Sequence, residues 1–160
     1  MMTIRIFIAL SLFGLLAACG GPGENAVVPK AQPAVASFVD IGDYVVHFSA
    51  QSTSELPLAV ATEYDYARSK NLAMLTVSII RESDGQSSPG EVSVKTRNLA
   101  GQPKNVTMEY REARGDSLAI YYIGITSIVN RETLIFDISV KPEGVDYVSN
   151  VRFQRQFFTD

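Results

Sequence analysis

The chain has 160 residues, a formal net charge of −3, one cysteine and one histidine. Its length predicts a single domain. The small net charge and the lack of a basic stripe exclude the nucleic-acid-binding classes. With one cysteine, no disulfide can form within the chain.

The first residues have the pattern of a bacterial lipoprotein signal peptide. Arg5 supplies a positive charge, residues 6–16 are mostly apolar, and Leu16-Ala17-Ala18-Cys19 has the form of a lipobox. The apolar run is too short for a comfortable membrane span, and no stop-transfer segment follows it. We therefore expect residues 1–18 to be removed and Cys19 to be lipidated. The alternatives are a chance cysteine after an ordinary signal peptide and a buried core cysteine.

Residues 19–36 follow this signal and are rich in glycine, proline and alanine. Such a composition is typical of a flexible tether. Gly20 stands where an aspartate would favour retention in the inner membrane. We expect an outer-membrane lipoprotein that faces the periplasm and contacts the membrane through its lipid.

The domain is expected at residues 37–160, where the pattern changes to short runs of alternating polar and apolar residues. Such runs, separated by turn residues, are typical of β-strands. About seven strands are predicted, with turn spacings close to those of an all-β sandwich. They cover residues 44–50, 71–82, 91–99, 106–111, 118–125, 133–141 and 147–158. The run at 118–125 is almost wholly apolar, which favours a central strand covered on both faces.

One segment departs from this alternation. Pro57 is well placed as a first helical residue, and the residues up to Tyr64 can form about two helical turns. A helix this short is not stable alone, so we expect it to pack on the sheet.

Several short motifs resemble a bacterial family of small periplasmic proteins known only as a domain of unknown function. Their order and spacing carry the resemblance from about Phe38 to Phe158, and an immunoglobulin-like fold is what it implies. No activity comes with it. The motifs are Gly42-Asp43-Tyr44 with Val46-His47-Phe48, Arg68-Ser69-Lys70, Arg97-Asn98-Leu99 with Gly101-Gln102, Tyr110-Arg111-Glu112, Ala119-Ile120-Tyr121-Tyr122, and Glu132-Thr133-Leu134 with Phe136-Asp137-Ile138.

Two positions depart from the family pattern. Asp65 stands where the family favours glycine, and Thr76 stands where it favours asparagine. If either family residue serves a site, that site is altered in this chain.

Candidate chemistry is sparse. His47, the only histidine, is predicted to point away from the core, where it is either a structural residue that hydrogen-bonds across the sheet or part of a small-ligand or metal site. A zinc site normally needs three or four ligands, and a general base needs a partner within about 3 Å. No nucleophile–base pair, catalytic residue, metal ligand set or cofactor site is assigned.

Charged residues near strand ends are the remaining candidates. Arg68 and Lys70 lie on a predicted connector, where they either bind a carboxylate or phosphate or hold the connector by bonding carbonyl groups or Asp43. We predict an Arg68–Asp43 ion pair. Arg97 is expected at the solvent-side end of a strand.

Three functions remain open at this point. The favoured one is a non-catalytic interaction module, tethered to the envelope, which binds a protein or cell-wall partner. The second is a periplasmic small-ligand or metal-binding protein that uses His47 and Arg68. The third is a hydrolase.

Replacement of Cys19 tests the anchor. Cells fed a palmitate analogue should label the wild-type chain, because the analogue is incorporated at the lipobox cysteine, and the wild-type chain should fractionate with the outer membrane. Equal labelling of Cys19→Ser would contradict the prediction.

Overall fold

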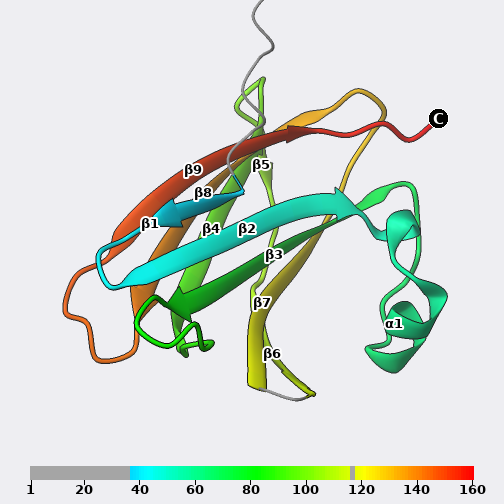
Figure 1. Ribbon diagram of the computed structural model, residues 1–160. Coiled ribbons are helices and arrows are strands. Elements are labelled where there is room, and N and C mark those ends of the chain that lie inside the picture. Colours follow the sequence, from blue (N-terminus) through cyan, green and yellow to red (C-terminus); the bar gives the residue numbers. More distant parts are fainter. Residues whose placement is uncertain (1–36, 116–117) are drawn as a thin grey trace, which may run out of the picture. The chain divides into compact units, whose positions relative to one another are not determined.

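The computed structural model describes residues 37–115 and 118–160, so the signal peptide and tether expected at 1–36 lie outside the described residues. The described part is a two-layer β-sandwich with one short α-helix (Figure 1). In chain order its elements are β1 Phe38–Asp40, β2 Tyr44–Ser52, the 3₁₀ helix η1 Thr53–Glu55, α1 Leu58–Glu63, β3 Leu72–Arg81, β4 Gly90–Asn98, β5 Pro103–Lys104, β6 Glu109–Arg114, β7 Leu118–Ser127, β8 Thr133–Pro142 and β9 Ser149–Gln156.

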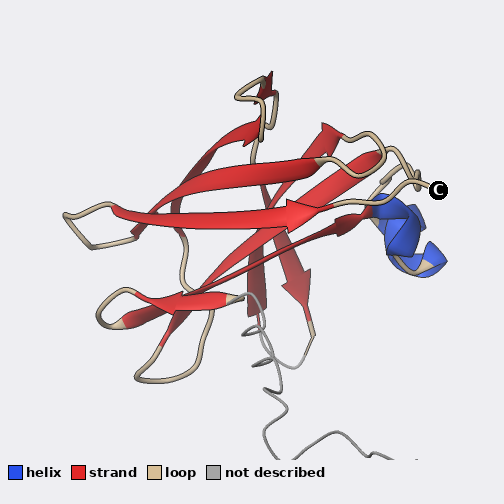
Figure 2. Ribbon diagram, turned by 90° about the horizontal axis from the view of Figure 1, so that it is seen from above, coloured by secondary structure: helices blue, strands red, loops and turns tan. Residues whose placement is uncertain are grey.

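The strands form two antiparallel sheets. Sheet A has the order β1-β2-β3-β7-β6, and sheet B has the order β5-β4-β8-β9. Seen from above, the two sheets lie face to face, with α1 at one end near the C-terminus (Figure 2). The predicted class, an all-β immunoglobulin-like sandwich with one short helix, is confirmed.

Strand number and one strand position differ from the prediction. The two additional strands, β1 and β5, have three and two residues, too few for an alternation to be recognised. β7 was predicted to be central and covered on both faces, but it lies next to the edge strand β6. The outer face of β7 is covered only in part, and Tyr121 is 36% exposed there.

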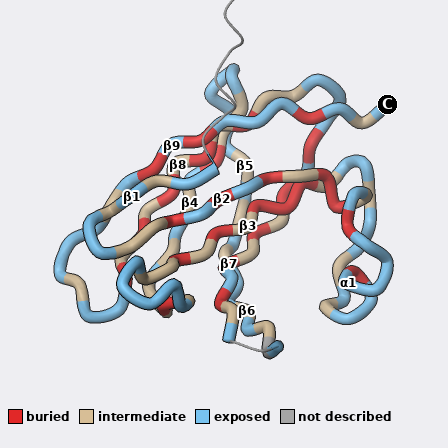
Figure 3. The backbone as a smooth tube through the Cα atoms, viewed as in Figure 1, coloured by how far each residue is buried: buried red, intermediate tan, exposed pale blue. Residues whose placement is uncertain are grey.

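The inner faces of both sheets form one core. Along β8 every second residue is buried, and along β2 and β3 the inward positions are buried in the same way (Figure 3). The alternation in the sequence predicts inward side chains at seven positions, and all seven are buried: Phe48, Leu75, Val77, Ile120, Phe136, Ile138 and Phe153.

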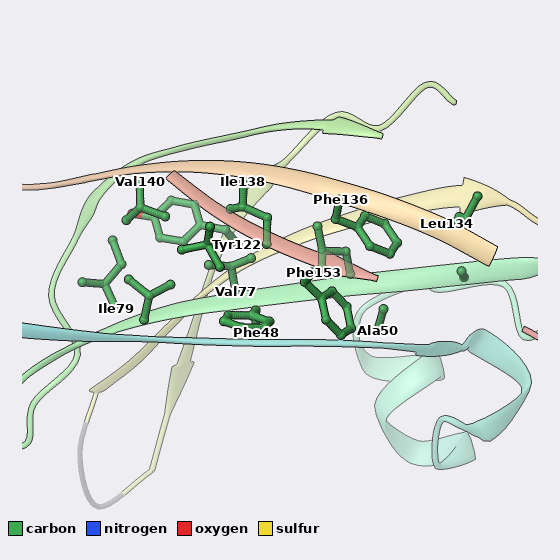
Figure 4. Packing of buried hydrophobic residues seen from close by; sticks show 14 of the residues in the cluster. Phe48, Ala50, Val77, Ile79, Tyr122, Leu134, Phe136, Ile138, Val140 and Phe153 are labelled. Atoms are coloured by element: carbon green, nitrogen blue, oxygen red, sulfur yellow. The ribbon is translucent and has the colours of Figure 1, made fainter. Parts of the chain in front are cut away.

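Three aromatic rings join the two sheets. Phe153 of sheet B lies 5.6 Å from Phe136 in its own sheet and 5.2 Å from Phe48 in sheet A, measured between ring centroids (Figure 4). Tilted and offset ring pairs at such distances stabilise a core beyond the area that they bury.

A buried tyrosine makes a second connection between the sheets. The Tyr122 hydroxyl donates to the carbonyl of Gly90, at 2.7 Å, and accepts from its backbone N–H, at 2.8 Å. A Cβ at position 90 would lie 2.5 Å from the Lys141 carbonyl oxygen, so glycine is required there. Burial raises the pKa of the Tyr122 phenol, so it remains a donor well above neutral pH.

The helix begins later than predicted. Pro57 is the N-cap of α1, with ψ of 139°, and Leu58 is the first helical residue. As expected, α1 packs on the sheet, because Ala61 and Leu56 are buried against Met74 of β3. Within residues 37–115 and 118–160, the helices are too short or too polar to cross a bilayer.

Truncation of a core phenylalanine tests this packing. Phe136 is fully buried, so Phe136→Ala should lower the free energy of unfolding by roughly 3–5 kcal/mol, as measured by urea denaturation. Leu99→Ala is the control, because Leu99 is 69% exposed. A loss below about 1 kcal/mol for Phe136→Ala would contradict the core assignment.

Candidate functional site

The connector between α1 and β3 is fastened to the turn that follows β2. The Thr53 hydroxyl donates to the Ser69 carbonyl, at 3.1 Å, and accepts from the Ser69 N–H, at 2.9 Å. The Ser52 hydroxyl donates to the same carbonyl, at 3.1 Å. Because Thr53 is fully buried, these bonds fix the connector at Ser69.

The charged residues beside Ser69 bind backbone carbonyl groups. Arg68 donates from Nη2 to the Ser54 carbonyl, at 2.7 Å, and Lys70 donates from Nζ to the Asp160 carbonyl, at 2.6 Å. The carbonyl-bonding alternative for Arg68 is therefore the one observed.

The predicted Arg68–Asp43 ion pair is wrong. Asp43 precedes β2 and its carbonyl accepts from Glu82 N–H, at 3.0 Å, whereas Ser54 lies beyond the other end of that strand. A strand of nine residues spans roughly 25 Å. The connector runs to the opposite end of the sandwich from the one that the prediction required.

His47 lies on the exposed outer face of sheet A, as predicted. Its ring is 5.8 Å from that of Phe38, its partner on β1. No hydrogen bond within the described part of the chain involves its imidazole, so the expected bond across the sheet is not observed. The middle of β2 holds His47, whereas Arg68 lies beyond the end of β2, so the two do not form one site.

Arg97 takes part in a charged cluster on the outer face of sheet B. Asp137 of β8 accepts hydrogen bonds from Arg97 of β4 and from Arg152 Nε of β9, the latter at 2.5 Å. Both bonds hold the pKa of Asp137 below its usual value, and the bond from Arg152 has the larger effect. The cluster ties three neighbouring strands together.

A second cluster, which sequence reasoning missed, surrounds Glu132. Its carboxylate is 2.9 Å from Lys104 Nζ and accepts from Asn98 Nδ2, at 3.3 Å, and from the Val129 N–H, at 3.0 Å. Burial alone would raise the pKa of Glu132, but these bonds outweigh it and hold the pKa below its usual value. Asn98 and Glu132 belong to the family-like motifs, which here connect a β4–β5 hairpin to the β7–β8 turn.

The end of α1 explains one departure from the family pattern. Asp65 has φ of 57°, and the next residue donates its N–H to the Ala61 carbonyl, at 2.8 Å. This is the helix-ending arrangement in which glycine is favoured, because the backbone is left-handed there. The family's glycine is therefore explained by backbone geometry.

The other departure lies in a hollow. Thr76 is on the floor of an apolar pocket of about 220 Å³, which we name the α1 pocket. Its wall on the helix side comes from Leu56, Val60, Tyr64 and Tyr66.

The outer face of sheet A forms the rest of the α1 pocket. Met74, Tyr121 and Ile123 supply its apolar surface, and Arg111 of the edge strand β6 lies at the rim. Arg111 is ion-paired with Glu109 and donates to the Tyr110 carbonyl, at 3.2 Å. An apolar pocket with a few polar groups is the usual form of a binding site.

A longer hollow, which we name the edge trough, adjoins the α1 pocket and has a volume of about 490 Å³. Its floor is Ile123 and Ile125 of β7. One wall is the α1 end, residues 64–66, and the other is formed by every second residue of one extended stretch: Asn105, Thr107, Glu109 and Arg111.

That extended stretch crosses from sheet B to sheet A. Val106 and Met108 point inward over Gly124, where a Cβ would clash with both side chains. This packing fixes the alternate residues outward, toward the edge trough. The alternation was visible in the sequence, but the hollow beside it depends on where α1 ends.

One buried polar atom of the residues that line the two hollows has no partner in the described part of the chain. The Tyr66 hydroxyl is buried and makes no hydrogen bond among the residues that the structure describes. Its ring stacks on that of Tyr64 at 6.1 Å. Such an orphaned hydroxyl is costly unless something else bonds it.

Comparison with known proteins gives a family and a related fold. Residues 38–160 match the family model described as "Domain of unknown function (DUF4426)". The crystal structure of a DUF4426 family protein from Pseudomonas aeruginosa PAO1 is 27% identical, with a TM-score of 0.62, and the match covers 77% of this chain and 94% of that chain. No curated protein matches this chain.

Replacement of Thr53 tests the fastening of the connector. Thr53→Val keeps the shape but leaves the Ser69 N–H and carbonyl without this hydroxyl, so the free energy of unfolding should fall by about 1–3 kcal/mol. Arg68→Ala, which removes one exposed hydrogen bond, should cost less. If Thr53→Val lowers the free energy of unfolding by no more than Arg68→Ala does in urea denaturation, the Thr53 hydroxyl is not the main contact that holds the connector.

Proposed function

The chain belongs to the DUF4426 family, and from that premise we propose that it is a lipid-anchored, non-catalytic binding module of the bacterial envelope. The α1 pocket and the edge trough are its binding site. The observation that carries this proposal is an apolar hollow open to solvent. Tyr66 is one of its lining residues, and the buried hydroxyl of Tyr66 has no partner within the described chain.

The pocket suits a bound apolar group. Val60 is 37% exposed and Tyr121 36% exposed at its mouth, and both would lose contact with water when an apolar group entered. Burial of apolar surface contributes roughly 25 cal/mol per Å², and this gain is set against the entropy that association costs.

The lipobox supports the envelope location. Lipidation at Cys19, with Gly20 after it, would place the domain on the outer membrane facing the periplasm. Two or more acyl chains make such an anchor stable. In this proposal residues 19–36 tether the domain, and its partner is a protein or cell-wall component of the envelope.

The test uses methionine methyl groups as reporters. Of the four methionines, Met74 lines the α1 pocket and Met108 packs on the main core. The full chain with ¹³C-methyl methionine, in phosphatidylcholine nanodiscs, is titrated with N-acetylphenylalaninamide, a water-soluble apolar probe. The Met74 resonance should shift to saturation, and the Met108 resonance should stay in place.

A matched pair of helix variants controls the titration. Val60→Lys places a charge at the pocket mouth and should lower the affinity for the probe at least fivefold. Leu58→Lys makes the same change on the same helix at a residue that does not line the pocket, so the affinity should be unchanged. An unshifted Met74 resonance, or equal affinities in the two variants, contradicts the proposal.

A further inference from the structure

We propose that the occupant of the two hollows is an extended peptide segment of a partner protein, with an apolar side chain in the α1 pocket and a basic residue in the edge trough. This inference rests on the proposed function and names its ligand class. Four observations on size, backbone, hydrogen bonding and charge lead to it.

The α1 pocket is small for a complete small-molecule ligand. Its volume is about 220 Å³, whereas sites for drug-sized ligands run from about 300 to 1,000 Å³. A hollow of that size takes one side chain. Buried aromatic side chains in such pockets provide most of the affinity in many protein interfaces.

The edge trough follows a stretch of several residues, as a peptide requires. The wall residues Asn105 and Arg111 are six positions apart on one extended stretch, which corresponds to roughly 20 Å. Arg111 borders both hollows, so a chain lying in the trough reaches the α1 pocket at that end.

The trough offers hydrogen-bonding groups along its length. Within the described chain, the backbone of residues 105–108 takes part in no strand pairing and no loop hydrogen bond. The side chains of Asn105 and Thr107 likewise have no partner among the described residues and are exposed. Peptide amides and carbonyls are the natural partners of such a row.

Charge selects a basic peptide. The ionisable groups of the trough are Asp65, Glu109 and Arg111, and Arg111 is ion-paired with Glu109. Asp65 is exposed and forms no ion pair among the described residues. A lysine or arginine of the peptide therefore gains an attraction beside Asp65, and a glutamate there meets only repulsion.

Three peptides test this inference with the Met74 methyl reporter in the same nanodiscs. Acetyl-Phe-Ser-Lys-Ser-amide should bind at least fivefold more tightly than N-acetylphenylalaninamide. The peptide with glutamate in place of lysine should bind no more tightly than that probe, and the peptide with serine in place of phenylalanine should not shift Met74. Raising the salt concentration should weaken only the lysine peptide, because exposed charges are screened.

Asp65→Asn removes the selecting charge and leaves the backbone intact, since asparagine tolerates a left-handed conformation. In this variant the lysine peptide should bind no more tightly than N-acetylphenylalaninamide. Asp146→Asn is the matched control, because Asp146 is exposed and lines neither hollow. Equal binding of the lysine and glutamate peptides, or an unchanged gain in Asp65→Asn, overturns the inference.

The outcomes separate this inference from the proposed function. If N-acetylphenylalaninamide binds and no peptide binds more tightly than it does, the pocket is a binding site but its ligand is not a basic peptide. Tighter binding of hexanoate than of any peptide would mean an acyl ligand. A Met74 shift that depends on protein concentration alone would mean a second copy of the chain. Both of these results also overturn the inference, and no shift with any probe overturns the proposed function as well.

Discussion

The contact of Phe153 with Phe136 and Phe48 is the one on which the sandwich depends. It joins β9 and β8 of sheet B to β2 of sheet A, with ring centroids 5.6 Å and 5.2 Å apart. Because side chains alternate along a strand, turning these rings inward turns every second neighbour outward. The same constraint therefore decides what each outer face displays to solvent.

The outward side chains make different contacts on the two outer faces. On sheet B, Asp137 is flanked by two arginines, and the face is held by charge. On sheet A, Ala61 of α1 packs on Met74, and a hollow remains that both Val60 of α1 and Tyr121 line. The α1 pocket exists because a six-residue helix is too short to cover the sheet beneath it.

The inner core was predictable because it depends on a local period, and each predicted core residue is buried. The short strands β1 and β5 were not, since three and two residues carry no period. The site was less predictable still. The outward position of Thr107 and Arg111 was visible in the alternation, but the hollow also needs Tyr64 and Tyr66, which only the folded connector brings to the outer face of β7. The Arg68–Asp43 pairing failed for the same reason, because the sequence does not say to which end of β2 the connector returns.

The motifs that carry the family resemblance mainly hold the fold together. Most of their polar groups already bond to the protein itself: Arg68 to a carbonyl, Arg97 to Asp137, and Asn98 to Glu132. A group that is satisfied within the fold gains little from a ligand, because it would exchange one partner for another. Among the residues that line the edge trough, Asp65, Asn105 and Thr107 have no side-chain partner in the described part of the chain, so they can still gain one. The proposed site therefore lies mostly outside the motifs, although Arg111 and Tyr121, which belong to them, line the hollows.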